Sequence, residues 1–218
     1  MSQPRSYRLL CPVARALDHL GDRWTLLILR DLHAGPARFS DLEAGLTGIA
    51  SNLLTTRLRQ LEADVLVLHR EAEFGVWLYQ LTEKGLGTAD LLYELAAFGS
   101  QFPPDDDVQR PGNLRTVALT LKVACRRVVD PQTCLTAELV IDGERFELVA
   151  GDGEVDVQYR VATDPDVILE TSYQPMVAVM DGVMSPEQFE RDHVCARAAD
   201  PRNLQELMAL LARAVTAD

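Results

Sequence analysis

Apolar residues recur at helical spacing through the first hundred positions of the chain. Residues 13–20 predict a first helix, and residues 24–32 predict a second that is apolar on most sides, as core helices are. Residues 40–43 have the sequence Ser-Asp-Leu-Glu, the S-x-x-E pattern of a capping box, and predict the start of a short third helix. This part of the chain is therefore expected to form a small helical core.

A longer helix is predicted over residues 51–63, where Leu54, Leu58 and Leu61 follow one another at i, i+4 and i+7. A β-hairpin is predicted next, because the β-rich runs 65–71 and 76–82 flank a short turn. Thr82 then predicts the cap of a last helix that reaches about Phe98. This order is that of a winged helix, in which the helix before the hairpin enters the major groove of DNA.

The predicted helix 51–63 has a polar side opposite its leucines. Asn suits a bidentate contact to adenine, Arg a contact to guanine or phosphate, and Thr a contact to phosphate or a thymine methyl group. A solvated polar face without a partner explains the pattern about equally well. The candidate DNA contacts, including one before the third helix and one on the wing, are Arg38, Ser51, Asn52, Thr55, Thr56, Arg57, Arg59 and Arg70.

The chain divides near residue 103. Residues 100–113 contain three prolines, three consecutive aspartates and a glycine, which predicts a linker. We therefore expect a first domain over residues 1–100, a linker over 101–113 and a second domain over 114–218. The fold class expected for the whole chain is α+β.

The second domain is expected to be a sheet covered by helices. The clearest hairpin joins residues 135–141 to 144–150 through Asp142–Gly143, a pair that favours the positive φ of a tight turn. Further strands are predicted over residues 114–125 and 155–163. The predicted helices are 165–172, 174–179, one that follows Ser185–Pro186, and a last one that Asp200 caps, with Leu204, Leu207, Met208 and Leu211 as its apolar stripe.

The amino-acid composition and the charge distribution limit the classes of protein to which the chain can belong. Apolar residues make up 47% and charged residues 25% of the 218 residues, which is typical of a folded protein with one core or two small ones. The net charge is −12, but the first hundred residues carry 10 Lys/Arg against 12 Asp/Glu and the rest carry 11 against 21. The acidic second half is expected to face away from DNA and anionic membranes. No segment predicts a transmembrane helix or a signal peptide, so a cytoplasmic protein is expected.

Catalytic and metal motifs are missing from the sequence. The four cysteines form no CxxC pair and no histidine lies near them at ligand spacing, so no metal site, cofactor or enzymatic activity is expected. Cys11 precedes Pro12 at the predicted start of the first helix, where the helix N-terminus would stabilise a thiolate. Cys11 is therefore a candidate redox switch, and an inert packed cysteine is the alternative.

Residues 7–99 resemble the HxlR family of bacterial winged-helix regulators, which are MarR-like dimers. The matching elements are Cys11–Pro12, Gly21 to Trp24, Leu26 to Leu32, Gly35, Arg38–Phe39, Gly48–Ile49, Leu54, Arg57–Leu58, Leu61, Leu81–Thr82 and Gly85. The resemblance implies DNA binding as a dimer, with helix 51–63 as the recognition helix. It also implies that the first helix and the helix 82–98 build the dimer interface, and that Cys11 occupies a position at which some members sense oxidants.

Two departures from the family pattern affect this helix. Ala50 stands where the family usually has a serine cap, so Ser51 is expected to substitute with the helix start shifted by one residue. Val65 replaces the usual glycine after the helix, which predicts a rebuilt turn if that site needs positive φ.

Residues 114–216 resemble, more loosely, the sterol-carrier-protein-like domain. The matching features are Ala162–Thr163–Asp164 ending a strand, a helix with Val167, Ile168 and Leu169, Met180–Asp181–Gly182 before Ser185–Pro186, and a closing helix after Asp200–Pro201. The resemblance implies an apolar tunnel for a hydrophobic small molecule; a filled core that serves dimerisation alone is the alternative. Candidate wall residues are Ile168, Leu169, Tyr173, Met176, Val177, Val179 and Met180.

The sequence thus favours a homodimeric transcriptional repressor that binds a pseudo-palindromic operator in double-stranded DNA, with a hydrophobic small molecule as a candidate effector. Two alternatives stay open. One is a lipid-binding protein whose winged helix serves protein contacts. The other is a regulator that Cys11 switches by oxidation.

Overall fold

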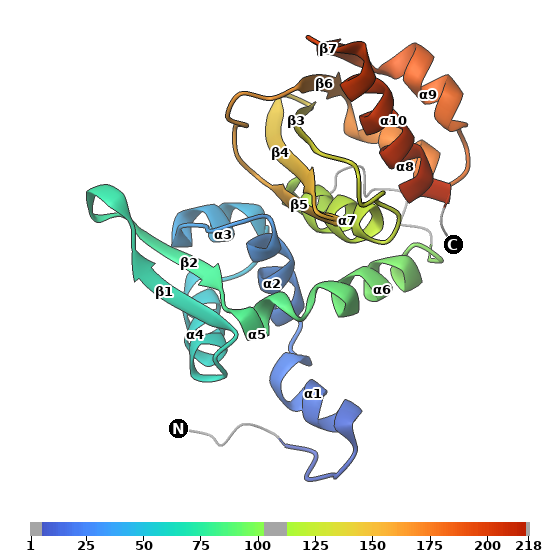
Figure 1. Cartoon of the computed structure of the whole chain (residues 1–218). Helices are drawn as coiled ribbons and strands as arrows, with labels where there is room; N and C mark the ends of the chain where they lie inside the picture. Colours follow the sequence, from blue (N-terminus) through green and yellow to red (C-terminus); the bar gives the residue numbers. More distant parts are fainter. Residues whose placement is uncertain (1–5, 103–112, 217–218) are drawn as a thin grey trace. The chain divides into compact units, whose positions relative to one another are not determined.

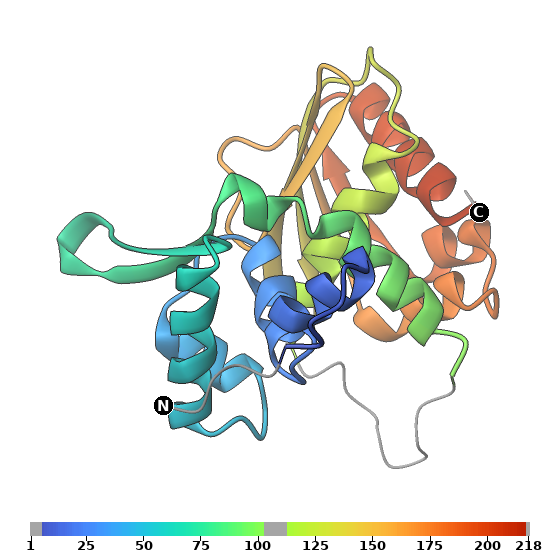
Figure 2. The same ribbon diagram turned by 90° about the horizontal axis from the view of Figure 1, so that it is seen from below.

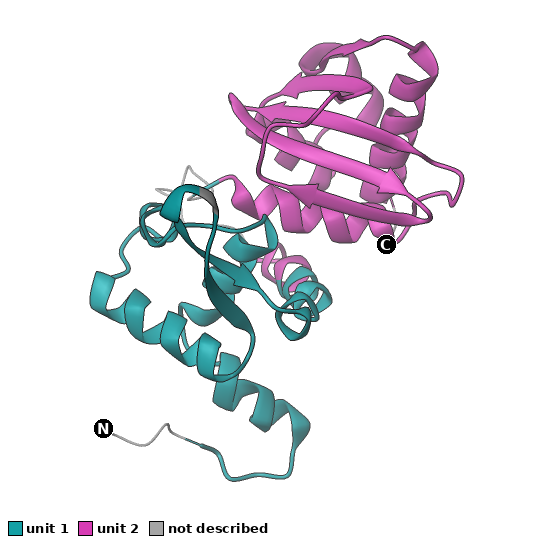
Figure 3. Cartoon of the chain, turned by 60° about the vertical axis from the view of Figure 1, so that its left-hand side comes forward, with its two compact units in different colours: residues 1–95, 106–113 teal, residues 96–105, 114–218 magenta. Residues whose placement is uncertain are grey.

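The computed structural model describes residues 6–102 and 113–216. Its backbone forms two compact units, one of residues 1–95 with 106–113 and the other of residues 96–105 with 114–218 (Figure 3). Most of the expected linker, residues 103–112, lies outside the described residues. Each unit has its own hydrophobic core and is described separately.

The first unit has the order of elements of a winged helix (Figure 1). The antiparallel strands of the wing pair from Val67 opposite Leu81 to Glu71 opposite Trp77. The winged helix predicted from the hydrophobic pattern is thereby confirmed. Its elements are α1 (Pro12–Leu20), α2 (Thr25–His33), α3 (Phe39–Gly45), α4 (Ser51–Ala63), β1 (Val67–Glu71), the short 3₁₀ turn η1 (Glu73–Gly75), β2 (Trp77–Leu81), α5 (Glu83–Leu86) and α6 (Ala89–Gly99), of which residues 96–99 are grouped with the other unit.

The single helix predicted after Thr82 is wrong, because the chain forms α5 and α6 with a break between them. Thr82 caps α5 as expected, since its Oγ1 accepts the N–H of Gly85 at 3.1 Å. At the break, Thr88 donates its hydroxyl to the carbonyl of Gly85 at 2.7 Å, and His33 of α2 contacts the same hydroxyl at 3.0 Å. These buried side-chain contacts compete with a continuous helix and set the start of α6.

The start of α3 also differs from the prediction. The residue before the helix is Arg38, and its backbone N–H donates to Oδ2 of Asp41 at 2.9 Å. Asp41 therefore supplies the carboxylate of the capping box in place of Glu43, because the helix begins at Phe39 and Asp41 becomes its third residue.

The turn that ends α4 keeps its left-handed residue even though that residue is a valine. Val65 has a φ of 59°. Its N–H donates to the carbonyl of Glu62 at 3.0 Å, and the N–H of Leu66 donates to the carbonyl of Leu61 at 2.9 Å, which is the Schellman pattern. The expected rebuilding of the turn is wrong: the two hydrogen bonds are kept, at a strain of about 1–2 kcal/mol for a side chain with a Cβ atom.

The second unit is a five-stranded sheet with helices, ordered β5-β4-β3-β6-β7 (Figure 1). β3 and β6 are parallel, and the other neighbours are antiparallel. α7 packs against β5, and α10 packs against α7, β3, β6 and β7. The elements are α7 (Arg115–Arg126), β3 (Leu135–Ile141), β4 (Glu144–Gly151), β5 (Glu154–Gln158), β6 (Val167–Thr171), α8 (Tyr173–Met180), α9 (Pro186–His193), β7 (Cys195–Ala198) and α10 (Pro201–Thr216).

Several predictions for this unit are confirmed. The hairpin β3–β4 turns at Asp142 and Gly143, whose φ values are 49° and 84°. Pro201 is the first residue of α10, and Leu207 on the predicted stripe is completely buried. The core between sheet and helices takes alternate strand residues, such as Leu139 of β3 and Leu148 of β4.

Two predicted elements are wrong. Residues 114–125 were expected as a strand but form α7, which buries Val117, Ala118, Ala124 and Cys125 at helical spacing. Residues 165–172 were expected as a helix, whereas Val167–Thr171 form β6, which lies between β3 and β7 in the sheet and buries alternate residues. In both segments the apolar residues fit the period of a helix as well as that of a strand, and packing within the unit decides between the two structures.

Candidate nucleic-acid interface

α4 presents its polar side to solvent and its leucines to the core. Leu54, Leu58 and Leu61 are at most 1% exposed. Asn52, Thr56 and Arg59 are exposed and recur at spacings of four and three residues, so that they form one face. Ser51 is also exposed and Thr55 is half-buried beside this face. These side chains are therefore available on one exposed face of α4 for contact with a partner.

The N-terminus of α4 has no side-chain cap. Ala50 is the residue before the helix, and its carbonyl accepts the N–H groups of Leu53 and Leu54 at 2.9 and 3.0 Å. Ser51 is the first helical residue, so the expected shift of the cap to Ser51 is wrong. The helix start still matches the predicted boundary, because Gly48 with a φ of 93° turns the chain just before it.

The two threonines of α4 hold their hydroxyl protons within the helix. Thr55 donates to the carbonyl of Ser51 and Thr56 donates to the carbonyl of Asn52, both at 2.8 Å. In this rotamer each hydroxyl offers lone pairs, and each methyl group remains available for contact with a thymine methyl group.

The candidate arginines differ in exposure and in the contacts they make within the protein. Arg59 and Arg38 are exposed, Arg38 just before α3. Arg70 on the wing donates its Nε–H to Gln80 at 2.7 Å. Arg57 is half-buried and forms an ion pair with Asp22 in the turn between α1 and α2. The structure therefore separates Arg57 from the exposed face that carries Arg59.

The wing is aromatic more than basic. His69 of β1 stacks on Tyr79 of β2 with ring centroids 4.2 Å apart and lies 4.9 Å from Trp77. Phe74 at the tip is 99% exposed and has a φ of 60°. Figure 2 shows this hairpin extending well beyond the end of α4 that it follows. Neither Phe74 nor Asp22 was predicted as a site residue; the sequence signal for Phe74 is the Phe-Gly pair in the turn, and that for Asp22 is its place within the family element Gly21 to Trp24.

The candidate wall residues of the second unit lie on two elements. Ile168 and Leu169 are on β6 and not on the expected helix, and the others lie on α8. Leu169 and Val179 are buried in the core, while Met180 is 58% exposed. Tyr173, Met176 and Val177 are half-buried.

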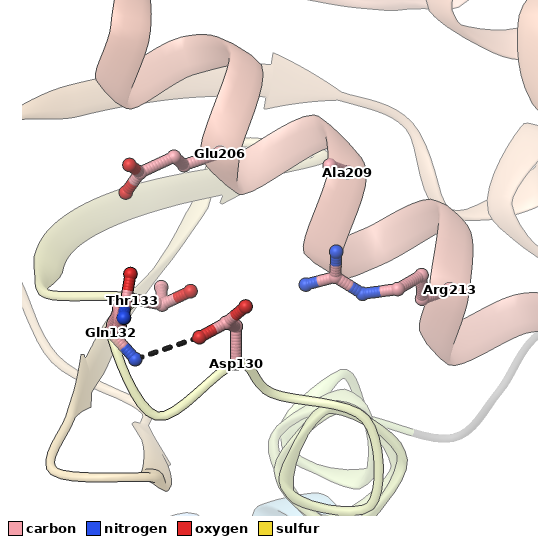
Figure 4. A pocket seen from close by; sticks show the side chains of 6 residues that line it. All are labelled: Asp130, Gln132, Thr133, Glu206, Ala209 and Arg213. Atoms are coloured by element: carbon pink, nitrogen blue, oxygen red, sulfur yellow. Dashed lines mark hydrogen bonds between the residues drawn. The ribbon is translucent and has the colours of Figure 1, made fainter.

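A hollow of about 180 Å³ lies elsewhere in this unit, between α10 and the segment before β3. Asp130 and Arg213 point into it, and Asp130 accepts the N–H of Gln132 at 2.8 Å (Figure 4). Its remaining lining residues are Thr133, Glu206 and Ala209, so none of the candidate wall residues contributes to it.

The cysteines divide by exposure. Cys11 is exposed and directly precedes α1, with Pro12 as the first helical residue. Cys134 and Cys195 are also exposed. Cys125 is buried, and burial raises the pKa of its thiol to about 12, so that it stays protonated at neutral pH. Among residues 6–102 and 113–216, no three His, Cys, Asp or Glu side chains come together as a metal site.

The wing, the core helices and the exposed polar face of α4 define a winged helix-turn-helix transcriptional regulator. A sequence profile of the HxlR-like helix-turn-helix family matches residues 19–107. The chain belongs to the HxlR family of helix-turn-helix transcriptional regulators.

Two relatives from Bacillus subtilis illustrate the match. The uncharacterized HTH-type transcriptional regulator YvaP is 35% identical over 97 residues, which are 43% of this chain and 89% of YvaP. The HTH-type transcriptional regulator YodB is 35% identical over 104 residues, which are 45% of this chain and 92% of YodB. A crystal structure titled quinone-bound YodB aligns with 43% of this chain and 100% of its own, at 34% identity and a TM-score of 0.38. None of the helices within residues 6–102 and 113–216 has the length and hydropathy of a membrane-spanning segment.

Proposed function

We propose that this regulator is a repressor that binds a pseudo-palindromic operator as a homodimer, with one α4 helix in the major groove of each half-site. The observation that carries the proposal is the division of α4 into a buried leucine side and an exposed side with Asn52, Thr56 and Arg59. Side chains of these types are the ones that distinguish base edges in the major groove. Arg38 and Arg70 are proposed as contacts to the phosphate backbone on either side of α4.

Exposed apolar side chains support the homodimer. On and before α1, Leu10, Val13 and Leu17 are 97%, 67% and 45% exposed. On α6, Leu91 and Leu95 are each 43% exposed. Large apolar residues gathered in this way on two helices are typical of a face that a second subunit covers. A second copy is the occupant that a two-fold symmetric operator requires.

The second unit is proposed as a sterol-carrier-like effector domain for a hydrophobic small molecule. The loose packing of α8 and α9 supports this: α9 buries none of its residues completely, and α8 buries only Val179. A pair of helices held this lightly can move to admit a ligand at low cost. Mass spectrometry under native conditions is expected to find a bound apolar molecule, and a protein that carries none and shows no thermal shift with fatty acids or sterols contradicts the effector role.

Replacing Arg59 by alanine tests the DNA interface. If Arg59 contacts a base, Arg59→Ala is expected to weaken binding to a selected operator duplex by about 1–3 kcal/mol and to relax the preference at one base pair. Binding is measured by fluorescence anisotropy on the selected duplex and on variants of it with single base-pair changes. Asn52→Ala should relax a different base pair.

Controls separate this proposal from its main alternative. An equal, small loss on every sequence would show that Arg59 meets phosphate only. A wild-type protein that binds no duplex even at low salt would favour the alternative of a lipid-binding protein whose winged helix contacts other proteins.

A redox switch at Cys11 is the second candidate, favoured by the exposure of Cys11 directly before α1. A modification there would act next to the proposed dimer face. The expected result is that an oxidant or a quinone releases the wild-type protein from DNA and leaves Cys11→Ser bound. Release of both proteins at the same oxidant concentration would exclude Cys11 as the switch.

A further inference from the structure

We propose that Arg57 is a positioning residue of the DNA interface and not a phosphate contact. It belongs to a set of four side chains, here called the α4 clamp. Two of them come from α4, namely Arg57 within the helix and Asp64 directly after it. The other two are His19 near the end of α1 and Asp22 shortly after it. This inference rests on the proposed function, since it requires α4 to be the helix that binds DNA.

The first contact of the α4 clamp joins Arg57 to Asp22. Arg57 Nη2 pairs with Oδ2 of Asp22, and Nη1 lies 3.4 Å from Oε1 of Gln60. The side chains of Arg57 and Asp22 are only 23% and 32% exposed, and Nε of Arg57 is shielded from solvent. An arginine that binds a phosphate on DNA needs its guanidinium group free at the surface, whereas this one is directed into the protein.

Asp22 itself accepts two hydrogen bonds from the start of the next helix. Its Oδ1 accepts the backbone N–H of Trp24 at 3.2 Å, and its carbonyl accepts the N–H of Thr25 at 3.2 Å. Asp22 therefore fixes the start of α2 with one carboxylate oxygen and binds Arg57 with the other. Because α2 buries most of its residues, Arg57 is tied to a core helix of the unit.

The second contact joins Asp64, directly after α4, to His19. Nδ1 of His19 lies at an ion-pair distance of 3.0 Å from Oδ2 of Asp64, a buried oxygen that accepts no hydrogen bond. From the other side, Lys84 of α5 donates to the carbonyl of Asp64 at 2.9 Å. Arg57 and Asp64 are seven residues apart and so lie on one side of the helix, while His19 and Asp22 are three apart. The α4 clamp thus holds α4 at two points, two turns apart.

The α4 clamp matters for recognition because base contacts depend on small displacements. Asn52 and Arg59 project from the opposite side of the same helix, so a rotation of α4 about its axis moves both relative to the groove. Contacts of this kind hold only when their side chains stay within about 0.5 Å of the productive position. Fixing the rotation of α4 is therefore a condition for sequence-specific binding. It does not change the electrostatic attraction between the protein and the phosphates of DNA.

Neutralising Asp22 distinguishes a positioning role of Arg57 from a phosphate contact, because the two roles predict opposite changes in DNA affinity. Asp22→Asn keeps the side-chain oxygen that accepts the Trp24 N–H and removes the charge that holds Arg57. The α4 clamp predicts that Asp22→Asn weakens specific binding about tenfold. If Arg57 instead contacts a phosphate in the complex, Asp22→Asn removes a competing negative charge and binding becomes tighter or stays unchanged.

The experiment uses the full chain, a duplex selected from a random pool and an unrelated duplex of equal length, each titrated over a series of salt concentrations. Arg57→Met and Asp22→Asn are expected to weaken binding to the selected duplex about tenfold and to leave both the unrelated duplex and the salt slope unchanged. The double variant should lose no more than either single variant, because both remove one contact. Arg57→Lys should restore part of the affinity.

Each other outcome overturns the proposal in a recognisable way. A salt slope for Arg57→Met that is smaller by about one, with weaker binding to both duplexes, would identify a phosphate contact. Equal losses on both duplexes with an unchanged slope, together with a lower unfolding temperature, would identify a purely structural role. Wild-type protein without salt-dependent binding to any duplex would refute the proposed function itself, and the positioning role with it.

Discussion

Gly85→Ala is expected to lower the unfolding temperature of the N-terminal unit by about 10–20 °C. A Cβ atom at position 85 would lie 2.1 Å from the carbonyl oxygen of Leu66 and 3.1 Å from its carbonyl carbon. That carbonyl cannot retreat freely, because it accepts the N–H of Thr82 at 3.0 Å. The overlap involves backbone in the turn between α4 and the wing, so relief requires α5 to move away, at a cost of about 3 kcal/mol.

The two tryptophans of the chain, Trp24 and Trp77, both lie in the N-terminal unit, so tryptophan fluorescence excited selectively over tyrosine follows the unfolding of that unit. Gly99→Ala, at the end of α6, controls for the addition of a Cβ atom: one there meets nothing within 4 Å, and the change should leave the unfolding temperature of the N-terminal unit unchanged. An unfolding temperature for Gly85→Ala equal to that of Gly99→Ala would contradict the close packing of α5 on this turn.

Charging the apolar face of α1 is expected to abolish tight operator binding. Val13 and Leu17 are one helical turn apart and exposed, and they belong to the proposed dimer face. Glutamates at both positions would repel their counterparts in a second subunit and remove the apolar area that it covers. Operator affinity should fall by a factor of about 10²–10⁴, because the two half-sites are then bound independently.

Sedimentation equilibrium should show this double variant as a monomer at concentrations at which the wild type is dimeric. The double variant Val161→Glu and Val183→Glu, at residues of the second unit that are 62% and 81% exposed, controls for the addition of two negative charges. An α1 double variant that stays dimeric and binds the operator fully would place the subunit interface elsewhere.

Periodicity predicted the winged helix well because its elements depend on local patterns. The leucines of α4 recur so regularly that only one side of the helix can be buried, and the exposure of Asn52 and Arg59 follows from that. The partner of Arg57 could not be predicted, since Asp22 lies far away along the chain and meets it only after α1, α2 and α4 have packed.

The second unit was harder to predict because its sheet is assembled from distant segments. The β3–β4 hairpin was recognisable from its Asp142–Gly143 turn, whereas β6 becomes a strand only through parallel pairing with β3 and antiparallel pairing with β7. The alternation of apolar residues in α7 equally suggested a strand, and its burial against β5 made it a helix.

Directed cleavage from α4 tests the central claim most directly. The exposed Cys11, Cys134 and Cys195 are replaced by serine, the buried Cys125 is retained because its raised pKa keeps it unreactive, and Thr56→Cys carries a DNA-cleaving iron chelate. If α4 lies in the major groove of each half-site, cleavage should occur at two clusters about one helical turn apart, roughly 10 base pairs. Cleavage spread evenly along the duplex, or none at all on a duplex that the protein binds, would contradict the account.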